Sequence, residues 1–332
     1  MKLINQKEKI FIAGATGMVG NAIKIKLYDS GYKNLITPSR KNLDLTNSRL
    51  VFDWFKKNKP DIVIISAAKV GGIYANDTFP VDFLLDNLKI QNNIIEAAWK
   101  NDVRRLLFLG SSCIYPKNSS QPIKEEELLK SSLEKTNEWY ALAKISGIKL
   151  CQALRKQYAF DAISLMPTNL YGKGDNYHES NSHVLPALLD RFHFHKVEKK
   201  QSIKCWGSGN PRREFMHVDD LAEASIFALE NWDPNNKNAP LDESNEPLNW
   251  LNVGTGRDIT IKNLAEMVAK VTSYDGEIIW DIKKPDGPKQ KLLDVSRLKS
   301  LGWESKIELE NGLKITYEQY KKELKDNSIR SK

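Results

Sequence analysis

Three glycines near the start of the chain, Gly14, Gly17 and Gly20, constrain its fold more than any other sequence feature. They follow a run of β-branched and aromatic residues at 9–13, and an amphipathic pattern that predicts a helix continues to about residue 30. Glycines at this spacing permit a tight turn, a close approach of the backbone to a ligand and close helix packing. A ligand phosphate there would meet unpaired N–H groups and the positive end of the helix dipole. The loop therefore predicts a dinucleotide-binding unit of strand, loop and helix.

The segments after this loop predict an α/β fold. Helical patterns alternate with four continuously apolar runs, which lie at 35–37, 61–66, 105–110 and 162–166. Strands that are apolar on both faces are typical of a parallel sheet covered by helices on each side. We therefore expect a Rossmann-type, doubly wound parallel sheet.

The first and second halves of the chain differ in this alternation. Residues 1–166 carry it and are expected to form the dinucleotide-binding domain, joined by a returning segment at about 214–236. From 167 onward the loops lengthen and become rich in Asn, Gly, His and Pro. Residues 167–332 are therefore expected to form mainly a smaller, mixed α/β domain that binds the substrate.

Charge and cysteine content narrow the class of protein. The formal net charge is +8, but the lysines are dispersed, which favours a solvated surface or attraction of anionic ligands over a nucleic-acid partner. Three cysteines without a C-x-x-C spacing indicate neither a disulfide framework nor a zinc site. The first ten residues lack the apolar core of a signal peptide, and no run is long enough to span a bilayer. We expect a cytoplasmic protein without a membrane partner.

The residue after the second apolar run indicates which dinucleotide binds. Sites that prefer NAD usually place an acidic residue there to hold the ribose 2′-hydroxyl. This chain has Arg40, with Lys41 beside it. A cation suits a 2′-phosphate, so the sequence favours NADP(H), and a simple surface charge is the alternative interpretation of Arg40.

Tyr140 and Lys144 are the first candidates for catalysis. Their spacing of four residues puts both side chains on one face of a predicted helix. A lysine beside a phenol favours the phenolate, so we expect Lys144 to lower the pKa of Tyr140 and to make it a proton donor for a carbonyl under reduction. Ser111 and Ser112 follow a predicted strand about thirty residues earlier, at the end of the sheet where ligands gather.

These motifs and the overall length resemble the extended short-chain dehydrogenase/reductase family, and longer motifs resemble its GDP-L-fucose synthases. The longer motifs extend over residues 9–320 and are AAKVGGI at 67–73, LGSSCIYP at 109–116, MPTNLYG at 166–172, NSHV at 181–184, WGSG at 206–209, REF at 213–215 and KPDG at 284–287. The resemblance implies a homodimer that binds GDP-4-keto-6-deoxy-D-mannose, epimerises C3 and C5, and reduces C4 with NADPH. The residues themselves indicate no metal site.

The resemblance also implies roles for individual residues. The catalytic residues are Ser111, Cys113, Tyr140, Lys144 and His183, with Cys113 as base and His183 as acid. The substrate-side residues are Arg191, Trp206 and Arg213. The cofactor-binding residues are Gly14, Thr16, Gly17, Met18, Val19, Gly20, Arg40, Asp44, Leu45, Lys144, Pro167, Asn169, Leu170 and His183.

One departure from the family and several alternatives stay open. GDP-L-fucose synthases commonly carry a basic residue inside the glycine loop, whereas this chain has Ala15 and Thr16 there. Without the family, Cys113 and His183 would be packing residues. A related 4-keto GDP-sugar, such as a heptose, is an alternative substrate. A 4,6-dehydratase is disfavoured, because it needs an acidic pair where this chain has Ser112 and Cys113. A cofactor sensor or RNA-binding relative is also disfavoured, because such proteins tend to lose the tyrosine–lysine pair, and this chain keeps Tyr140 and Lys144.

Two further histidines, His193 and His195, alternate with phenylalanines. No carboxylate or cysteine set accompanies them, so we do not interpret them as metal ligands.

Overall fold

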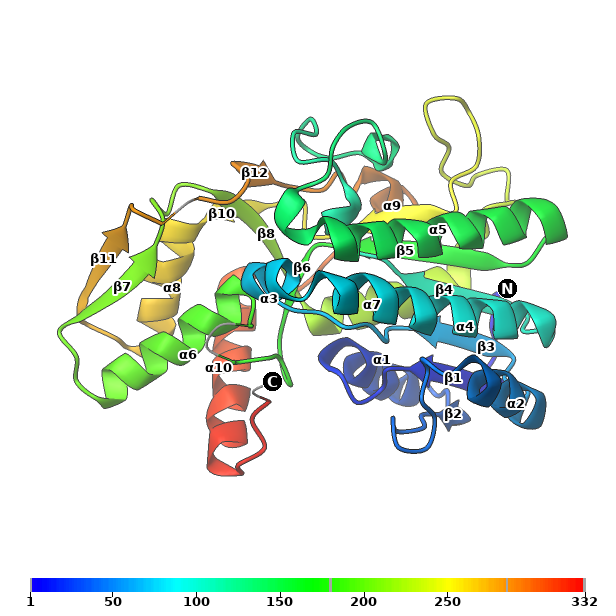
Figure 1. Ribbon diagram of the computed structural model, residues 1–332, viewed down its shortest axis with the longest axis horizontal. Helices are drawn as coiled ribbons and strands as arrows, with labels where there is room; N and C mark the ends of the chain where they lie inside the picture. Colours follow the sequence, from blue (N-terminus) through cyan, green and yellow to red (C-terminus); the bar gives the residue numbers. More distant parts are fainter. Residues whose placement is uncertain (1, 179–180, 285, 331–332) are drawn as a thin grey trace.

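A six-stranded parallel sheet forms the larger part of the computed structural model, which describes residues 2–178, 181–284 and 286–330 (Figure 1). Its strands, in spatial order, are β2 (Leu35–Ile36), β1 (Ile10–Ala13), β3 (Ile62–Ile65), β4 (Arg105–Leu109), β5 (Ala162–Pro167) and β9 (Trp250–Val253). The chain enters the sheet at β1, moves outward through β2, and then crosses to β3, β4 and β5. The sheet is Rossmann-like and doubly wound, because the strand order reverses at β1, and the alternating pattern predicts this class of fold.

Helices cover both faces of this sheet. One face carries α1 (Met18–Asp29) and α7 (Val218–Asn231), and the other carries α2 (Ser48–Asn58), α4 (Asn87–Lys100) and α5 (Glu138–Tyr158). Each face of the sheet has its own hydrophobic core, and alternate residues of β1 point into the two cores. Ile10 and Ile12 pack under α1 and α7, whereas Phe11 and Ala13 pack under the other three helices. A strand that is apolar on both faces therefore stands between two hydrophobic cores, as the continuous apolar runs predict.

The second half of the chain contributes both a helix and a strand to the larger part. Helix α7 lies within the returning segment that the sequence indicates, and it packs against α1. Strand β9 pairs with β5, with Leu165 opposite Leu251, and the sequence analysis did not identify it. The sheet is therefore completed only after the chain has formed the first elements of the smaller part of the molecule.

The smaller part, on the left in Figure 1, has its own sheets and core. Its strands are β6 (Asn169–Tyr171), β8 (Arg212–His217), β10 (Asp258–Thr260) and β12 (Gln290–Lys291) in one sheet, and β7 (Ser202–Trp206) with β11 (Glu277–Asp281) in another. Its helices are α6 (Val184–Val197), α8 (Ile261–Thr272) and α10 (Leu309–Lys325). Short helices α3 (Ile73–Thr78) and α9 (Ser296–Ser300) complete the regular structure together with short helical segments at Asp82–Asp86, Ser112–Ile114, Glu125–Glu127 and Lys135–Asn137.

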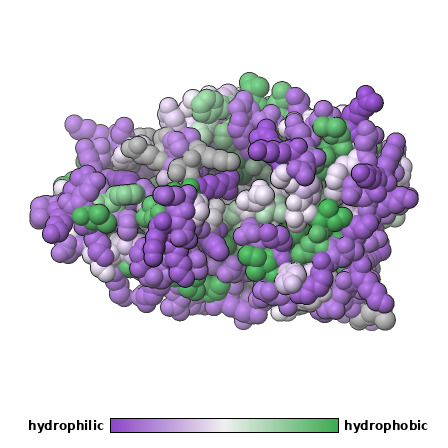
Figure 2. Space-filling model, turned by 90° about the horizontal axis from the view of Figure 1, so that it is seen from below, coloured by the Kyte–Doolittle hydropathy of each residue, from purple (hydrophilic) through white to green (hydrophobic). Residues whose placement is uncertain are grey.

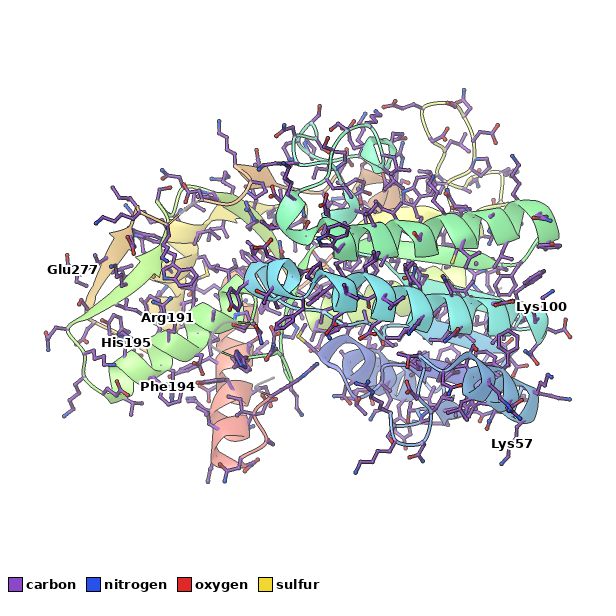
Figure 3. All side chains as sticks on the ribbon, viewed as in Figure 1. Lys57, Lys100, Arg191, Phe194, His195 and Glu277 are labelled. Carbon is purple, nitrogen blue, oxygen red and sulfur yellow. The ribbon has the colours of Figure 1, made fainter. Side chains whose placement is uncertain are left out.

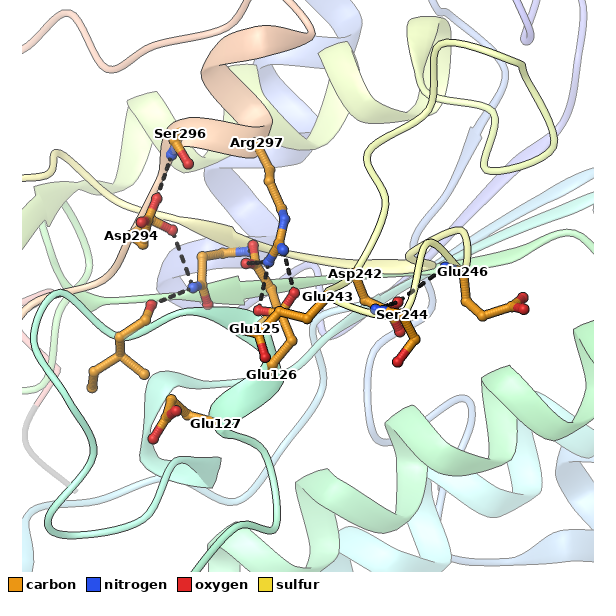
Figure 4. A network of polar contacts seen from close by, with 12 residues as sticks. Glu125, Glu126, Glu127, Asp242, Glu243, Ser244, Glu246, Asp294, Ser296 and Arg297 are labelled. Carbon is orange, nitrogen blue, oxygen red and sulfur yellow. Dashed lines mark hydrogen bonds and ion pairs between the residues drawn. The ribbon is translucent and has the colours of Figure 1, made fainter.

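A buried ion-pair network ties three distant segments together (Figure 4). The Arg297 guanidinium lies 2.5 Å from Glu125 and also pairs with Glu126. Glu125 is 1% exposed and accepts a hydrogen bond from the backbone N–H of Asn252 at 2.9 Å. The hydroxyl of Tyr115 donates to the Asn252 side chain at 2.6 Å. The network therefore joins α9 and β9 to the chain that follows β4.

The surface carries no broad apolar patch on the face that Figure 2 shows. Hydrophilic residues cover most of that face, and hydrophobic ones appear in small, separate groups. Within the part of the chain that the structure describes, no helix is both long enough and apolar enough to cross a membrane.

Candidate active site

The glycine loop lies between β1 and α1, at the carboxyl end of the large sheet. Gly14 has φ +88°, and a Cβ on it would lie 2.7 Å from the backbone nitrogen of Ala67. A Cβ on Gly20 would lie 2.2 Å from the carbonyl oxygen of Gly14. Packing inside the protein therefore requires glycine at both positions.

Gly17 differs from the other two glycines, because packing does not explain it. It is the N-cap of α1, and a Cβ there would lie 3.4 Å from its nearest neighbour, which is an ordinary contact distance. The missing side chain instead leaves the helix N-terminus open to a ligand. The first turn of α1 contains no acidic residue. The loop, including Thr16, Met18 and Val19, therefore fits the pyrophosphate of a dinucleotide.

The residues after β2 form the neighbouring rim. Arg40 is exposed four residues beyond the end of the strand. The carboxylate of Asp44 accepts hydrogen bonds from the backbone N–H and the hydroxyl of Thr46, at 3.0 and 2.8 Å. These bonds lower the pKa of Asp44, with a smaller contribution from the Arg40 charge. Leu45 packs against the core beside α4.

Helix α5 holds Tyr140 and Lys144 on one face, as the spacing predicts. The Lys144 ammonium is 3% exposed and lies 5.7 Å from the centre of the Tyr140 ring. It donates a hydrogen bond to the carbonyl oxygen of Leu109 at 2.8 Å. Burial lowers the pKa of Lys144 to about 8.

The expected effect of Lys144 on the tyrosine is not what the structure shows. Burial raises the pKa of Tyr140 well above its usual value, and Cys113 adds to this rise. The reason is that the Lys144 ammonium is directed to Leu109, so desolvation of the phenol dominates. Tyr140 is therefore protonated at neutral pH, which is the state that a proton donor needs.

Ser111 and Cys113 stand on a short helical turn directly after β4. The Ser111 hydroxyl oxygen accepts a hydrogen bond from the backbone N–H of Cys113 at 3.4 Å. Cys113 is 8% exposed, and burial raises the pKa of its thiol. Three features oppose this rise and lower the pKa of the thiol: the charge of Lys291, the hydrogen bond with Ser111 and the charge of Lys144.

Lys291 is a site residue that the sequence analysis missed. It lies on the two-residue strand β12, whose pairing with β8 sets it opposite Arg213. Burial lowers the pKa of Lys291, while the charge of Cys113 opposes that shift. No motif or periodicity marks this lysine in a lysine-rich chain, so only the pairing of β12 with β8 reveals it.

His183 stands at the N-cap of α6 with an extended backbone. Its side chain reaches solvent, yet surrounding protein atoms desolvate it, which lowers its pKa and keeps the imidazole neutral at pH 7. The preceding segment packs against the AAKVGGI motif: the backbone N–H of Gly72 donates to the carbonyl oxygen of Asn181 at 2.9 Å. A Cβ on Gly72 would lie 2.5 Å from the carbonyl oxygen of Ser182, so close packing explains that glycine.

Three further residues expected to bind the cofactor lie at or just after the end of β5. Pro167 is the last residue of β5, and Asn169 and Leu170 lie on β6. The Asn169 amide donates to the carbonyl oxygen of Glu214 at 2.8 Å, and Leu170 packs against the core under α7. They stand at the carboxyl end of the sheet, on the side of the glycine loop.

The substrate-side candidates lie in the smaller part. Arg213 donates to the carbonyl oxygen of Pro288 at 2.6 Å and interacts electrostatically with Lys291, which links it to the Cys113 region. Arg191, labelled on α6 in Figure 3, donates to the carbonyl oxygen of Lys204 on β7. Trp206 is 69% exposed at the end of β7. Their described contacts keep Arg191 and Trp206 within the smaller part, and Pro285 of the KPDG motif lies outside the described residues.

Two histidines and a cavity of the smaller part do not belong to the candidate active site. The His193 ring is within hydrogen-bonding distance of the Tyr317 hydroxyl at 3.0 Å, and the His195 ring contacts the carbonyl oxygen of Ser202 at 3.2 Å. A cavity of about 470 Å³ lies between α8, α9 and α10, but none of the candidate residues lines it. The titratable groups, rather than that cavity, locate the candidate site.

Comparison with known proteins identifies the family of the chain. Residues 10–240 match the family described as "NAD dependent epimerase/dehydratase family". GDP-L-fucose synthase of Escherichia coli (strain K12) is 52% identical over 316 residues, covering 94% of this chain and 96% of that protein. GDP-L-fucose synthase 1 of Arabidopsis thaliana is 51% identical, covering 96% of this chain and 94% of that protein.

A solved structure is also similar over the whole chain. The GDP-mannoheptose C4 reductase of Campylobacter jejuni, solved with NADP bound, is 37% identical with a TM-score of 0.84, covering 96% of this chain and 99% of that one. The chain therefore belongs to the NAD dependent epimerase/dehydratase family, in the group that contains the GDP-L-fucose synthases.

Proposed function

We propose that the protein converts GDP-4-keto-6-deoxy-D-mannose to GDP-L-fucose by epimerising C3 and C5 and reducing C4 with NADPH. The observation that carries this proposal is the set of Cys113, Tyr140 and Lys144 beside the carboxyl end of the sheet. The names of relatives at about 50% identity over nearly the whole chain support it.

The cofactor of this reaction is NADP(H). The open Gly17 and the acid-free first turn of α1 suit its pyrophosphate, and Arg40 suits its 2′-phosphate. Bound NADPH supplies the hydride that reduces C4. The other residues proposed to hold the cofactor are Gly14, Thr16, Met18, Val19, Gly20, Asp44, Leu45, Lys144, Pro167, Asn169, Leu170 and His183.

Epimerisation needs a base and an acid on opposite faces of the sugar. The C4 ketone acidifies the neighbouring C–H bonds, and Cys113 as thiolate takes a proton to leave an enolate. Ser111 and Tyr140 donate hydrogen bonds to the enolate oxygen. His183 returns a proton on the other face. Before it donates, the imidazole, which desolvation keeps neutral, takes up that proton from solvent, and the Cys113 thiol releases its proton to solvent before the next epimerisation. The charges of Lys291 and Lys144 help this thiol to ionise.

Reduction uses the same groups in other roles. Tyr140 gives its phenolic proton to the C4 oxygen as the hydride arrives, and the raised pKa of the phenol keeps that proton available at neutral pH. Lys144 is charged at neutral pH and stabilises the developing phenolate. Arg191, Trp206 and Arg213 hold the GDP moiety, in which the two arginines suit the pyrophosphate.

The assembly, compartment and domain division are also part of the proposal. We infer a homodimer from the family resemblance alone. A reducing cytoplasm suits the three cysteines, Cys113, Cys151 and Cys205, which are all free thiols. Residues 1–166 with the 214–236 segment would hold the cofactor, and residues 167–332 would mainly hold the GDP-sugar.

A related 4-keto GDP-sugar is the second candidate substrate. The similarity to the Campylobacter jejuni GDP-mannoheptose C4 reductase favours it, because few substitutions in a pocket admit one additional hydroxymethyl group. A cofactor sensor or RNA-binding protein would have no need for the buried Lys144 next to Tyr140.

The test is incubation with GDP-4-keto-6-deoxy-D-mannose and NADPH in deuterated water, followed by NMR of the product. GDP-L-fucose with deuterium at C3 and C5 is expected. A reduced but unepimerised sugar, or unreacted sugar, would overturn the proposed substrate. The same incubation with a 4-keto GDP-heptose is the matched comparison.

A further inference from the structure

The C-terminal segment brings an arginine to the glycine loop. A guanidinium nitrogen of Arg330 lies 3.9 Å from the position that a Cβ on Gly17 would occupy. The other neighbour of that position is the backbone oxygen of Gly14, so Arg330 is the side chain that faces the open side of the loop. More than three hundred residues separate Arg330 from Gly17 in the sequence.

Backbone contacts hold this segment in place. The carbonyl oxygen of Arg330 accepts a hydrogen bond from the backbone N–H of Tyr177 at 2.9 Å. Ile329, one residue earlier, packs against the core of the smaller part. The Glu323 carboxylate at the end of α10 accepts from the backbone N–H of Gly174 at 3.0 Å. A Cβ on Gly174 would lie 4.0 Å from the Cα of Met18, so these contacts fix the segment directly beside the glycine loop.

Among the residues that the structure describes, none forms a hydrogen bond or ion pair with the Arg330 guanidinium, which leaves it open to a ligand. Asp175 is the carboxyl group that its charge influences, and Asp175 is 4% exposed. One Asp175 oxygen accepts from the backbone N–H of Asn176 at 2.7 Å, and the other has no hydrogen-bond partner. Arg330 therefore forms no hydrogen bond with that second oxygen. The loop itself contributes no cation, because no basic residue stands between Gly14 and Gly20.

We propose that Arg330 binds a phosphate group of the dinucleotide cofactor and supplies the positive charge that the glycine loop of this chain lacks. The inference rests on the proposed use of NADP(H). A guanidinium beside a helix N-terminus adds charge-assisted hydrogen bonds to the backbone N–H groups already there. The arrangement also links cofactor binding to the C-terminal segment of the smaller part.

The experiment is a fluorescence titration of the full-length protein with NADPH and, separately, with NADH. Arg330→Gln is expected to weaken NADPH binding about tenfold, the typical effect of losing one hydrogen bond to a charged group. Arg330→Lys keeps the positive charge but not the planar guanidinium with its paired N–H donors. Its affinity for NADPH should therefore lie between those of wild type and Arg330→Gln. Lys325→Gln, which removes an exposed cation at the end of α10, is the matched control and should change the affinity less than twofold.

The two cofactors distinguish the phosphates. If Arg330→Gln weakens NADPH but not NADH, the contact is to the 2′-phosphate, and if it weakens both, the contact is to the pyrophosphate. Both results support the proposal. Equal affinities of Arg330→Gln and wild type for both cofactors would overturn it. Failure of the wild type to bind NADPH would instead overturn the proposed function.

Discussion

The ammonium group of Lys144 donates a hydrogen bond to the carbonyl oxygen of Leu109, 2.8 Å away. This bond fastens α5 to the last residue of β4. Because Ser111 and Cys113 follow β4 at once, and Tyr140 lies one turn before Lys144, this contact helps to set the two catalytic segments against each other. The relationship explains how residues from two separate parts of the chain can act on one sugar ring.

Replacement of Tyr140 by phenylalanine tests the proton donor. Removing the hydroxyl should lower the rate of NADPH oxidation about 10²–10⁴-fold, the usual contribution of a positioned acid. NADPH affinity should stay unchanged, because the ring and its packing remain. Stopped-flow measurement of NADPH absorbance gives the rate of NADPH oxidation, and fluorescence titration gives the affinity for NADPH. A Tyr140→Phe protein that keeps most of its reductase rate would show that another group gives the proton.

Replacement of Lys291 by methionine tests the electrostatics at Cys113. The Lys291 charge favours the thiolate, so its loss should raise the pKa of the Cys113 thiol and slow alkylation by iodoacetamide at neutral pH. The measurement is the alkylation rate of the Cys113 peptide against pH, followed by mass spectrometry.

Two matched variants interpret that result. Lys291→Arg keeps the charge and should retain the wild-type pH profile. Lys289→Met removes an exposed lysine two residues away and should have no effect. If all four proteins give the same profile, Lys291 does not act on the thiol.

Asp175 predicts a pH-dependent contribution to stability. Burial raises its pKa from 3.8 to about 7, so the folded protein keeps a proton that the unfolded chain releases near pH 4. This stabilisation is fully present below about pH 4 and is lost as the pH rises through about 7. Asp175→Asn mimics the protonated form, so its stability relative to wild type should increase between pH 5 and pH 8, by about 3 kcal/mol.

Urea unfolding at the two pH values measures this difference. Asp53→Asn, at an exposed position on α2, is the control, and its stability relative to wild type should not change with pH. The same pH-independence for Asp175→Asn would contradict the assignment.

The Arg297 network predicts a large loss of stability. Arg297→Met leaves the buried Glu125 without its partner, so the free energy of unfolding should fall by about 3–5 kcal/mol. Lys299→Met breaks only the exposed pair with Glu304 on the same side of the molecule and should cost about 0–1 kcal/mol. Chemical denaturation of both variants gives the comparison. Similar values for the two would mean that the buried pair contributes no more than a surface pair.

The sequence predicted the large sheet better than the smaller part, for physical reasons. Strands such as β3 and β4 are apolar on both faces and stand between long helices, so their pattern is clear. Strand β12 has two residues and β10 has three, and neither is long enough to show an alternation. Strand β9 follows a polar loop and reaches the sheet from the far part of the chain, which no local pattern could reveal.

The candidate site divides in the same way. The glycine loop and the Tyr140–Lys144 pair could be predicted because each is a local motif with fixed spacing. Lys291 and Arg330 could not, because each reaches the site through strand pairing or backbone contacts formed in three dimensions. The pKa of Tyr140 was expected in the wrong direction, because spacing shows that a lysine is near but not where its ammonium points.

The position of β9 has a consequence for the protein during its synthesis on the ribosome. Until Val253 has been made, β5 is the edge of the sheet, with one row of backbone groups unpaired. Such an edge can pair with a strand of another chain. The nascent protein therefore presents an unpaired β5 edge while residues 168–253 are being translated, and a chaperone that covers this edge during that interval would protect it.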